Sequence, residues 1–169
     1  MSFHHWRPVA VPVLRRAAPA VAVVAAAVFA AAGCTASGGT EAVVPSPDTK
    51  AAAYCRSLDH RLPQRVDGLD RDDPSPASAL TAGWGDPAII LRCGVVRPAA
   101  MGDENADGVD VNGVGWLVEQ QSDGSYRFTS TLRKAYVEVT LPKQRKDDGL
   151  APLTDLAGPV KKSVPEGIA

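Results

Sequence analysis

The order of apolar and polar residues divides the chain into one apolar run, one helix and a series of strands. Residues 17–32 are almost entirely Ala and Val, whereas residues 49–62 place apolar side chains on one side of a helix that ends before Pro63. The pattern then changes to the alternation and short apolar runs typical of strands, over 88–95, 109–120, 126–130 and 135–141. Short turns between consecutive strands favour antiparallel pairing.

These elements predict an α+β fold, in which a four-stranded, mainly antiparallel sheet has an N-terminal helix and a short C-terminal helix on one face. The C-terminal helix has apolar residues at helical spacing from Leu153, but Pro159 is expected to limit it to about two turns. Residues 67–85 are rich in Asp, Pro, Ser and Gly, so we expect an irregular surface connection there. Two glycines within 109–120 indicate a bulge beside Trp116.

The apolar run at the N-terminus has the organisation of a secretory signal over residues 1–33. Three arginines and no acidic residue precede or enter it, and the small residues Ala31-Ala32-Gly33 follow it. The next residue, Cys34, completes a pattern that resembles the lipobox of bacterial lipoproteins, in which the cysteine thiol receives a diacylglycerol. We therefore predict a lipid anchor on Cys34 at the extracytoplasmic face of the membrane; ordinary cleavage and an uncleaved anchor are the alternatives.

The remainder of the chain is expected to form a tether and one small domain. Residues 34–48 are mostly Thr, Ser, Gly, Pro and Ala without periodicity, which predicts a flexible tether. Residues 49–169 are enough for one globular domain. All 19 acidic residues but only 15 of the 18 basic ones lie from Cys34 onward. This balance gives no electrostatic reason to bind nucleic acid.

Two cysteines remain if Cys34 is acylated. An even pair in an oxidising compartment favours a disulfide between Cys55 and Cys93, which would join the first helix to the first strand. Two free buried thiols are the alternative.

Catalytic motifs are sparse. Only His60 follows the signal segment, and its place near a helix C-terminus explains it without a catalytic role. No nucleophile elbow, S-x-x-K motif or phosphate-binding glycine loop occurs. We therefore expect no cofactor and no enzymatic activity, although an enzyme that uses carboxylates alone stays open.

One loop resembles the first half of a calcium-binding loop. Asp103, Asn105 and Asp107 alternate before Gly108, as in the pattern D-x-[DN]-x-[DN]-G. The twelfth position, which supplies a bidentate carboxylate in such loops, is Val114. A polar hairpin loop without metal is the alternative to a weak calcium site.

A small-ligand site is the remaining candidate. Trp84 and Asp86 lie in a Trp-Gly-Asp-Pro corner, which suits either a sugar or peptide ligand or the packing of a turn. On the sheet face opposite the helices, Arg92, Tyr136 and Glu138 are expected to share one surface. A cross-strand ion pair between Arg92 and Glu138 is the simpler explanation of these two charges.

Short segments across residues 51–142 resemble an uncharacterised actinobacterial envelope family, domain of unknown function 3515. The most specific part is the string from Trp84-Gly85 through Pro87-Ala88-Ile89 to Leu91-Arg92-Cys93-Gly94-Val95. The other matching pieces are Cys55, Leu58, Leu62-Pro63, Val114, Trp116, Arg133, Val137-Glu138-Val139 and Pro142. Where the family has a glycine before the matching arginine, this chain has Leu132. The resemblance implies an exported or membrane-anchored protein and no assigned activity.

Together these features predict an exported, membrane-anchored lipoprotein of the cell envelope that binds or assembles other components without catalysis. Its partners would be the membrane, through the lipid, and an envelope protein or the cell wall. The alternative hypothesis is a ligand-binding module for cell-wall sugar or peptide.

Overall fold

The computed structural model describes residues 40–169, so the predicted signal segment 1–33 and Cys34 lie outside the described residues. The elements that the described residues form are, in chain order, α1 (Thr49–Asp59), β1 (Arg65–Val66), β2 (Leu69–Asp70), β3 (Thr81–Trp84), β4 (Ile89–Val95), η1 (Ala99–Gly102), β5 (Gly108–Val111), β6 (Val114–Gln120), β7 (Tyr126–Ser130), β8 (Tyr136–Leu141), η2 (Lys143–Asp148) and α2 (Ala151–Ser163).

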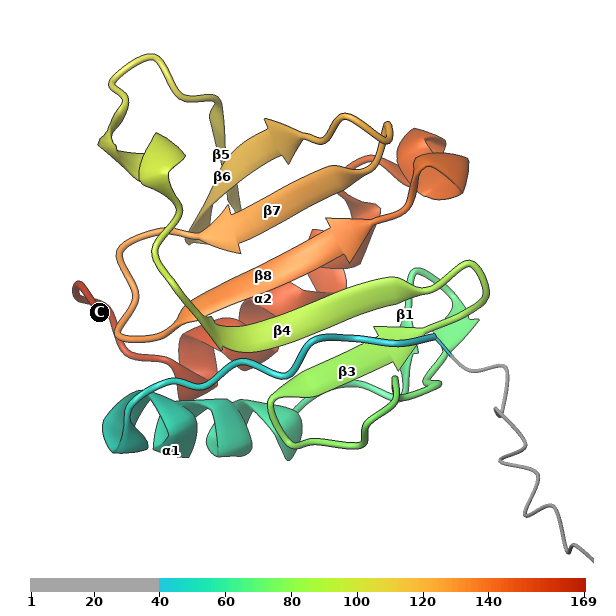
Figure 1. Ribbon diagram of the computed structural model, residues 1–169, viewed down its shortest axis with the longest axis horizontal. Coiled ribbons are helices and arrows are strands. Elements are labelled where there is room, and N and C mark those ends of the chain that lie inside the picture. Colours follow the sequence, from blue (N-terminus) through green and yellow to red (C-terminus); the bar gives the residue numbers. More distant parts are fainter. Residues whose placement is uncertain (1–39) are drawn as a thin grey trace, which may run out of the picture. The chain divides into compact units, whose positions relative to one another are not determined.

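The main sheet has six strands in the order β3-β4-β8-β7-β6-β5, and every neighbouring pair is antiparallel. Figure 1 shows the last strand, β8, lying beside β4 in the middle of the sheet. The predicted antiparallel α+β architecture is confirmed, but the expected number of four strands is wrong. A separate two-stranded sheet, β1-β2, is also present.

Two unexpected elements arise from turns with positive φ angles. Residues 109–120 form two strands, β5 and β6, rather than one bulged strand, because Asn112 (φ 52°) and Gly113 (φ 79°) make a two-residue hairpin turn. Asp67 (φ 50°) and Gly68 (φ 74°) join β1 to β2 in the same way. Asn-Gly and Asp-Gly are the residue pairs that such turns prefer. The expected bulge beside Trp116 is therefore wrong.

Another missed strand, β3, also lies within the segment predicted as an irregular connection. The strand has only four residues, Thr-Ala-Gly-Trp, and Ala and Gly are too small to give a recognisable strand pattern. Gly83 is needed because an added Cβ would lie 2.5 Å from the carbonyl oxygen of Asp72, which belongs to the segment that crosses over β3. Strand β3 is therefore specified by its pairing with β4 and not by a local sequence pattern.

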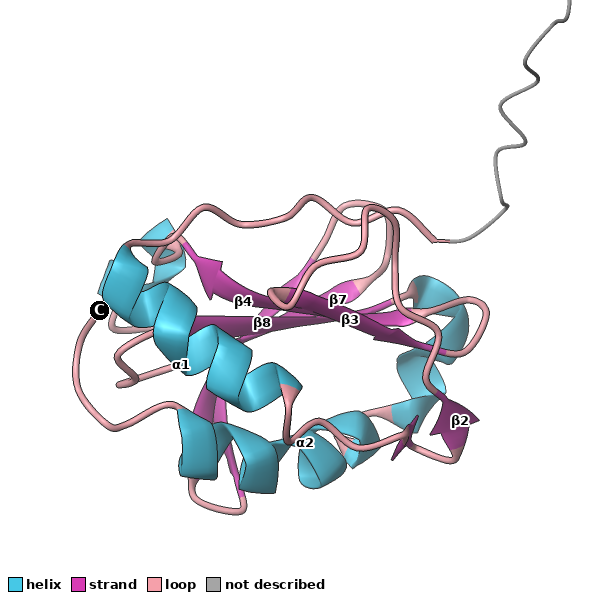
Figure 2. Ribbon diagram, turned by 90° about the horizontal axis from the view of Figure 1, so that it is seen from below, coloured by secondary structure: helices cyan, strands magenta, loops and turns pink. Residues whose placement is uncertain are grey.

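Both α-helices cover the same face of the sheet (Figure 2). Helix α1 begins as predicted, since Asp48 Oδ1 accepts hydrogen bonds from the backbone N–H groups of Lys50 (2.8 Å) and Ala51 (2.9 Å). The helix ends at Asp59 instead of Leu62. Its last residues tighten into i to i+3 bonds, in which Leu62 N–H donates to Asp59 O at 3.2 Å.

Helix α2 is longer than predicted because it continues through Pro159 to Ser163. Proline removes one helical hydrogen bond and crowds the preceding turn. The apolar residues on either side of it, Leu156, Ala157 and Val160, are all 0% exposed. Their burial against the sheet and α1 outweighs the lost hydrogen bond.

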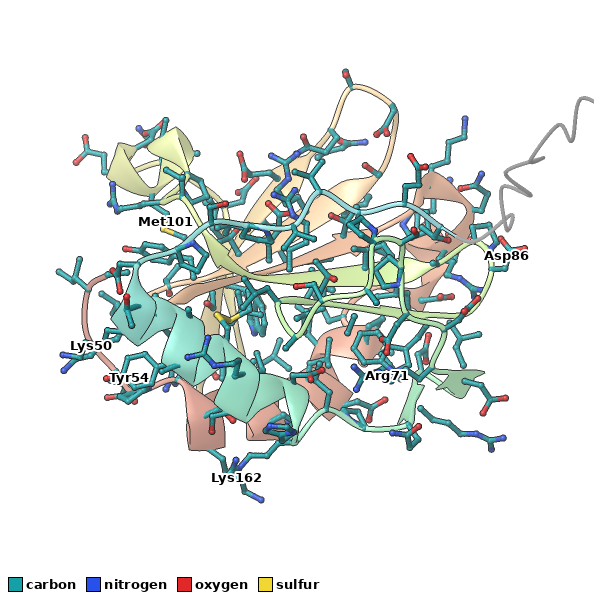
Figure 3. The ribbon with its side chains drawn as sticks, turned by 60° about the horizontal axis from the view of Figure 1, so that its bottom comes forward. Lys50, Tyr54, Arg71, Asp86, Met101 and Lys162 are labelled. Atoms are coloured by element: carbon teal, nitrogen blue, oxygen red, sulfur yellow. A yellow bond between two sulfur atoms is a disulfide. The ribbon has the colours of Figure 1, made fainter. Side chains whose placement is uncertain are left out.

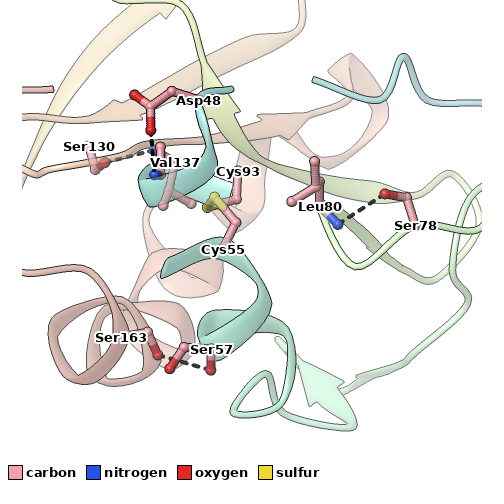
Figure 4. The surroundings of a disulfide bond; sticks show 10 residues. Asp48, Cys55, Ser57, Ser78, Leu80, Cys93, Ser130, Val137 and Ser163 are labelled. Carbon is pink, nitrogen blue, oxygen red and sulfur yellow. Dashed lines mark hydrogen bonds between the residues drawn. A yellow bond between two sulfur atoms is a disulfide. The ribbon is translucent and has the colours of Figure 1, made fainter. Parts of the chain in front are cut away.

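The hydrophobic core lies between the sheet and the two helices. From β4 it includes Ile89, Leu91 and Cys93, while Val137 and Val139 of β8 lie on the same face. The Cys55–Cys93 disulfide joins α1 to β4 with a Cα–Cα distance of 5.5 Å (Figure 4). This confirms the predicted bridge.

Residues 40–48, which precede α1, lie across the other face of the sheet, in front of β3 and β4 in Figure 1. Ala42 N–H donates to Ser75 O at 3.0 Å, and Ser75 N–H donates to Thr40 O at 2.9 Å. Further along, Pro47 packs so closely on Gly94 that a Cβ there would lie 2.5 Å from it. The tether predicted over 34–48 is thus held against the domain from residue 40 onward.

Candidate functional site

A cavity of about 620 Å³ opens on the helix-free face, at the β5–β6 end of the sheet. The loop between β4 and β5, residues 96–107, forms its outer wall, and Figure 1 shows this loop standing beyond the end of β4. The floor includes Leu117 from β6 and Tyr136 from β8, and Leu132 and Ile168 lie at the rim. The volume is within the range of small-molecule binding sites.

Apolar side chains supply much of this cavity. Leu117 and Tyr136 are each only 4% exposed, so the floor is a rigid part of the fold. Met101 contributes from the outer wall, where Arg97 Nη2 donates to Met101 O at 2.7 Å and holds the loop in place. Two large apolar residues at the rim remain open to solvent, Leu132 at 68% and Ile168 at 74%.

The backbone at the cavity shows two local adaptations. An added Cβ on Gly115 would lie 2.5 Å from Thr131 Oγ1, so a larger residue there would require the Thr131 side chain to move. The residue after Thr131, Leu132, has a φ of 50°. This left-handed conformation disfavours a branched apolar side chain, and glycine would adopt it without strain.

The cavity also has an acidic side, formed by Asp103, Asp107 and Asp110. Asp110 Oδ1 accepts a hydrogen bond from Gly113 N–H at 2.9 Å, and Asp103 Oδ1 accepts one from Asn105 N–H at 2.9 Å. No ion pair within residues 40–169 neutralises any of the three carboxylates. The three carboxylates outnumber Arg97, the one cationic side chain of the lining, so the site is suited to an uncharged or positively charged ligand.

The weak calcium candidate coincides in part with this acidic side. Asp103 and Asp107 line the cavity, whereas Asn105 folds back and directs its Nδ2 at Asp103 Oδ1, 3.3 Å away. Among the residues that the structure describes, no three His, Cys, Asp or Glu side chains gather closely enough to hold a metal ion.

The predicted Trp84–Pro87 corner lies at the other end of the sheet. Figure 3 labels Asp86 and Met101, which mark the two ends. Trp84 is 0% exposed and its Nε1 donates to Pro63 O at 3.0 Å, so it faces the core and has no surface to offer a ligand. Arg145 Nε donates to Pro87 O at 2.6 Å and closes the turn. Trp84 therefore packs in the core, as the sequence also allowed, whereas Asp86 is exposed at the turn.

The remaining predicted ligand residues lie on the helix-free face, but only Tyr136 reaches the cavity. Arg92 and Glu138 are cross-strand neighbours with an Nη1–Oε1 distance of 3.3 Å. The other carboxylate oxygen of Glu138 lies 3.5 Å from Arg127 Nε. This confirms the predicted cross-strand ion pair between Arg92 and Glu138.

Sequence reasoning missed most of the cavity because its residues come from four separate parts of the chain. Arg97, Met101, Leu117 and Ile168 belong to no motif. One local signal was present, namely Leu132 at a position where the resembling family has glycine.

Comparison with known proteins assigns the chain to a family. The profile of the family described as "Protein of unknown function (DUF3515)" matches residues 13–168. The chain belongs to the DUF3515 family. This match covers the described domain except its last residue and includes every residue that lines the cavity. No curated protein and no solved structure gives a significant match to this DUF3515 chain.

None of the helices within residues 40–169 is long and apolar enough to cross a membrane.

Proposed function

We propose that this DUF3515 chain is a non-enzymatic binding protein of the cell envelope and that its ligand occupies the cavity on the helix-free face. The observation that carries this proposal is the cavity itself, about 620 Å³ in volume with a rigid apolar floor and an acidic side. Small-molecule sites typically combine such a mostly apolar surface with a few polar groups that orient the ligand.

The composition of the cavity supports binding rather than catalysis. Its lining residues include no His, Cys, Ser or Lys, and Thr131 is the one lining residue with an aliphatic hydroxyl. Nucleophilic catalysis uses such a side chain next to a base. The one histidine of the described domain, His60, is exposed at the C-terminal end of α1.

The same cavity favours a ligand-binding module over a purely structural assembly protein. An assembly surface needs no deep concave site, whereas this one extends under the loop 96–107 to the buried side chains of Leu117 and Tyr136. A cell-wall peptide or a sugar that carries an amine would suit the three carboxylates. The proposed address, a lipid anchor on Cys34, rests on the sequence pattern alone.

The test is retention of envelope material by the full-length protein in detergent. Ala106→Trp should fill the cavity from its loop wall and abolish retention of the ligand, measured by mass spectrometry of the material released on denaturation. Ala99→Trp is the matched control, because Ala99 is exposed and does not line the cavity. Equal retention by both variants would reject the cavity as the binding site.

A further inference from the structure

The two edges of the main sheet differ in how they are protected. The outer side of β3 is covered by residues 70–72, since Asp72 N–H donates to Gly83 O at 2.9 Å and Gly85 N–H donates to Asp70 O at 3.0 Å. No segment within residues 40–169 pairs with the outer side of β5, the strand at the opposite edge. An open edge of this kind is a template for an added strand.

The register of β5 and β6 identifies the backbone groups that are available. Asp107 O accepts a hydrogen bond from Val118 N–H at 2.8 Å, and Val109 is the partner of Trp116. Hydrogen-bonding direction alternates along a strand, so the N–H and C=O groups of Gly108 and Asp110 point away from β6. Both residues are exposed.

The cavity borders this open edge directly. Gly108 and Asp110 both line it, together with the apolar floor at Leu117. A strand added beside β5 would direct every second side chain onto the helix-free face, where the cavity and the carboxylates lie. One such side chain would meet Asp107 or Asp110, and its neighbour on that face would reach the cavity.

Charge decides between two possible occupants of the edge. A second copy of the chain would bring two Asp107 and two Asp110 carboxylates to a single pair of strands, and repulsion among these like charges disfavours that pairing. A peptide with a basic side chain would instead gain from both carboxylates.

We propose that the β5 edge binds an extended basic peptide, which adds one strand to the sheet and places an apolar side chain in the cavity. This inference rests on the cavity being the binding site and specifies the class of ligand. Main-chain hydrogen bonds to Gly108 and Asp110 hold the peptide, and the cavity and the carboxylates select its side chains.

The test uses the full-length protein in detergent and the fluorescent peptide Ac-Thr-Leu-Thr-Lys-Thr-Leu-NH2, whose Leu and Lys side chains share one face. Fluorescence anisotropy should show saturable binding that weakens with salt. The peptide with Glu in place of Lys should bind about tenfold more weakly. Two further versions are N-methylated at alternate positions; one should lose binding and the other keep it, because only one edge of the peptide faces β5.

A matched pair of protein variants tests the edge itself. Gly108→Pro removes an outward N–H and should weaken binding about tenfold, the effect of losing one well-made hydrogen bond. Gly108→Ala keeps the N–H, and its Cβ would lie 3.5 Å from Trp116 O, an ordinary contact, so affinity should stay within about twofold. Asp107→Asn should lower affinity for the Lys peptide only. Hydrogen exchange at β7 and β8 checks that each variant is folded.

Several results would overturn the proposal. Equal binding of both N-methylated peptides would exclude strand addition, as would a dimer that Gly108→Pro dissociates. Absence of peptide binding would also overturn the strand-addition proposal. If Ala106→Trp still abolished retention of envelope material in that case, the cavity would remain the proposed site for another class of ligand. If neither experiment gave an effect, both proposals would fail.

Discussion

Removal of the Cys55–Cys93 disulfide should cost this domain a large part of its stability. The bridge joins residues separated by 38 positions in the sequence. In the chain-entropy model, a loop of this length restricts the unfolded chain by about 4 kcal/mol. Both sulfurs belong to residues that are only 1% exposed, so replacing the two cysteines with Ala also leaves a small void that costs about 1 kcal/mol. The total is comparable with the whole stability of a marginal domain.

Urea unfolding measures this effect through tryptophan fluorescence. Trp84 and Trp116 are 0% and 1% exposed, so their emission reports loss of the core. The Cys55→Ala/Cys93→Ala variant should have a free energy of unfolding about 4–5 kcal/mol below that of the oxidised protein. Reduction should lower the stability of the native protein by most of that amount and leave the double variant unchanged.

A difference below about 1 kcal/mol between oxidised protein and double variant would refute the entropic argument. It would mean that α1 is held mainly by packing of Ala51 and Leu58 and that the unfolded chain is already compact. Mass spectrometry of non-reduced peptides checks the bond itself, since free alkylation of both thiols in the native protein would show that no bridge forms.

Four further predictions concern single sites. Leu132→Gly should raise the free energy of unfolding by about 0.5–1 kcal/mol, because it relieves the left-handed backbone at a mostly exposed residue. An unchanged free energy of unfolding, or an equal increase in Leu132→Ala, would count against this reasoning. Burial and the neighbouring Asp148 carboxylate raise the pKa of Asp67 above its ordinary value of 3.8. The stabilising contribution of protonated Asp67 is therefore fully present below pH 3.8 and is lost as pH rises through the folded-state pKa. Asp67→Asn should therefore flatten the pH dependence of Tm above that value and stabilise the neutral-pH protein by a few tenths of a kcal/mol, up to about 1 kcal/mol; an unchanged profile would contradict the assignment. Cys34→Ser should abolish incorporation of labelled lipid, and persistent labelling would exclude this anchor. Millimolar calcium should leave Tm nearly unchanged, whereas a clear stabilisation that is lost in Asp103→Ala would reveal a metal site.

The sequence predicted those elements whose pattern is local. The start of α1 at Thr49, the faces of β4 and the alternation of β8 depend on residues close together in the chain. The disulfide followed from the apolar face of each element together with the even number of cysteines. Nearby residues in the sequence determine each of these features, apart from the pairing of the two cysteines.

The missed elements depend on contacts between distant segments or on turns. Strand β3 exists because β4 pairs with it, and α2 continues beyond Pro159 because its apolar face is buried. The β5–β6 hairpin had a readable signal in Asn112-Gly113, but the two glycines of that region were interpreted as a bulge instead. The cavity had no such signal, since its wall, floor and rim meet only after the sheet has formed.

The distribution of backbone strain singles out one residue at the rim of the proposed binding cavity. Three non-glycine residues in the described part of the chain have positive φ angles, namely Asp67, Asn112 and Leu132. The first two have short polar side chains that tolerate this conformation, and each precedes a glycine in a hairpin turn. Leu132 has neither advantage, is 68% exposed and lies on the cavity. Stability alone would favour glycine there, and a bulky apolar side chain at that point fits the proposal that the cavity binds a ligand.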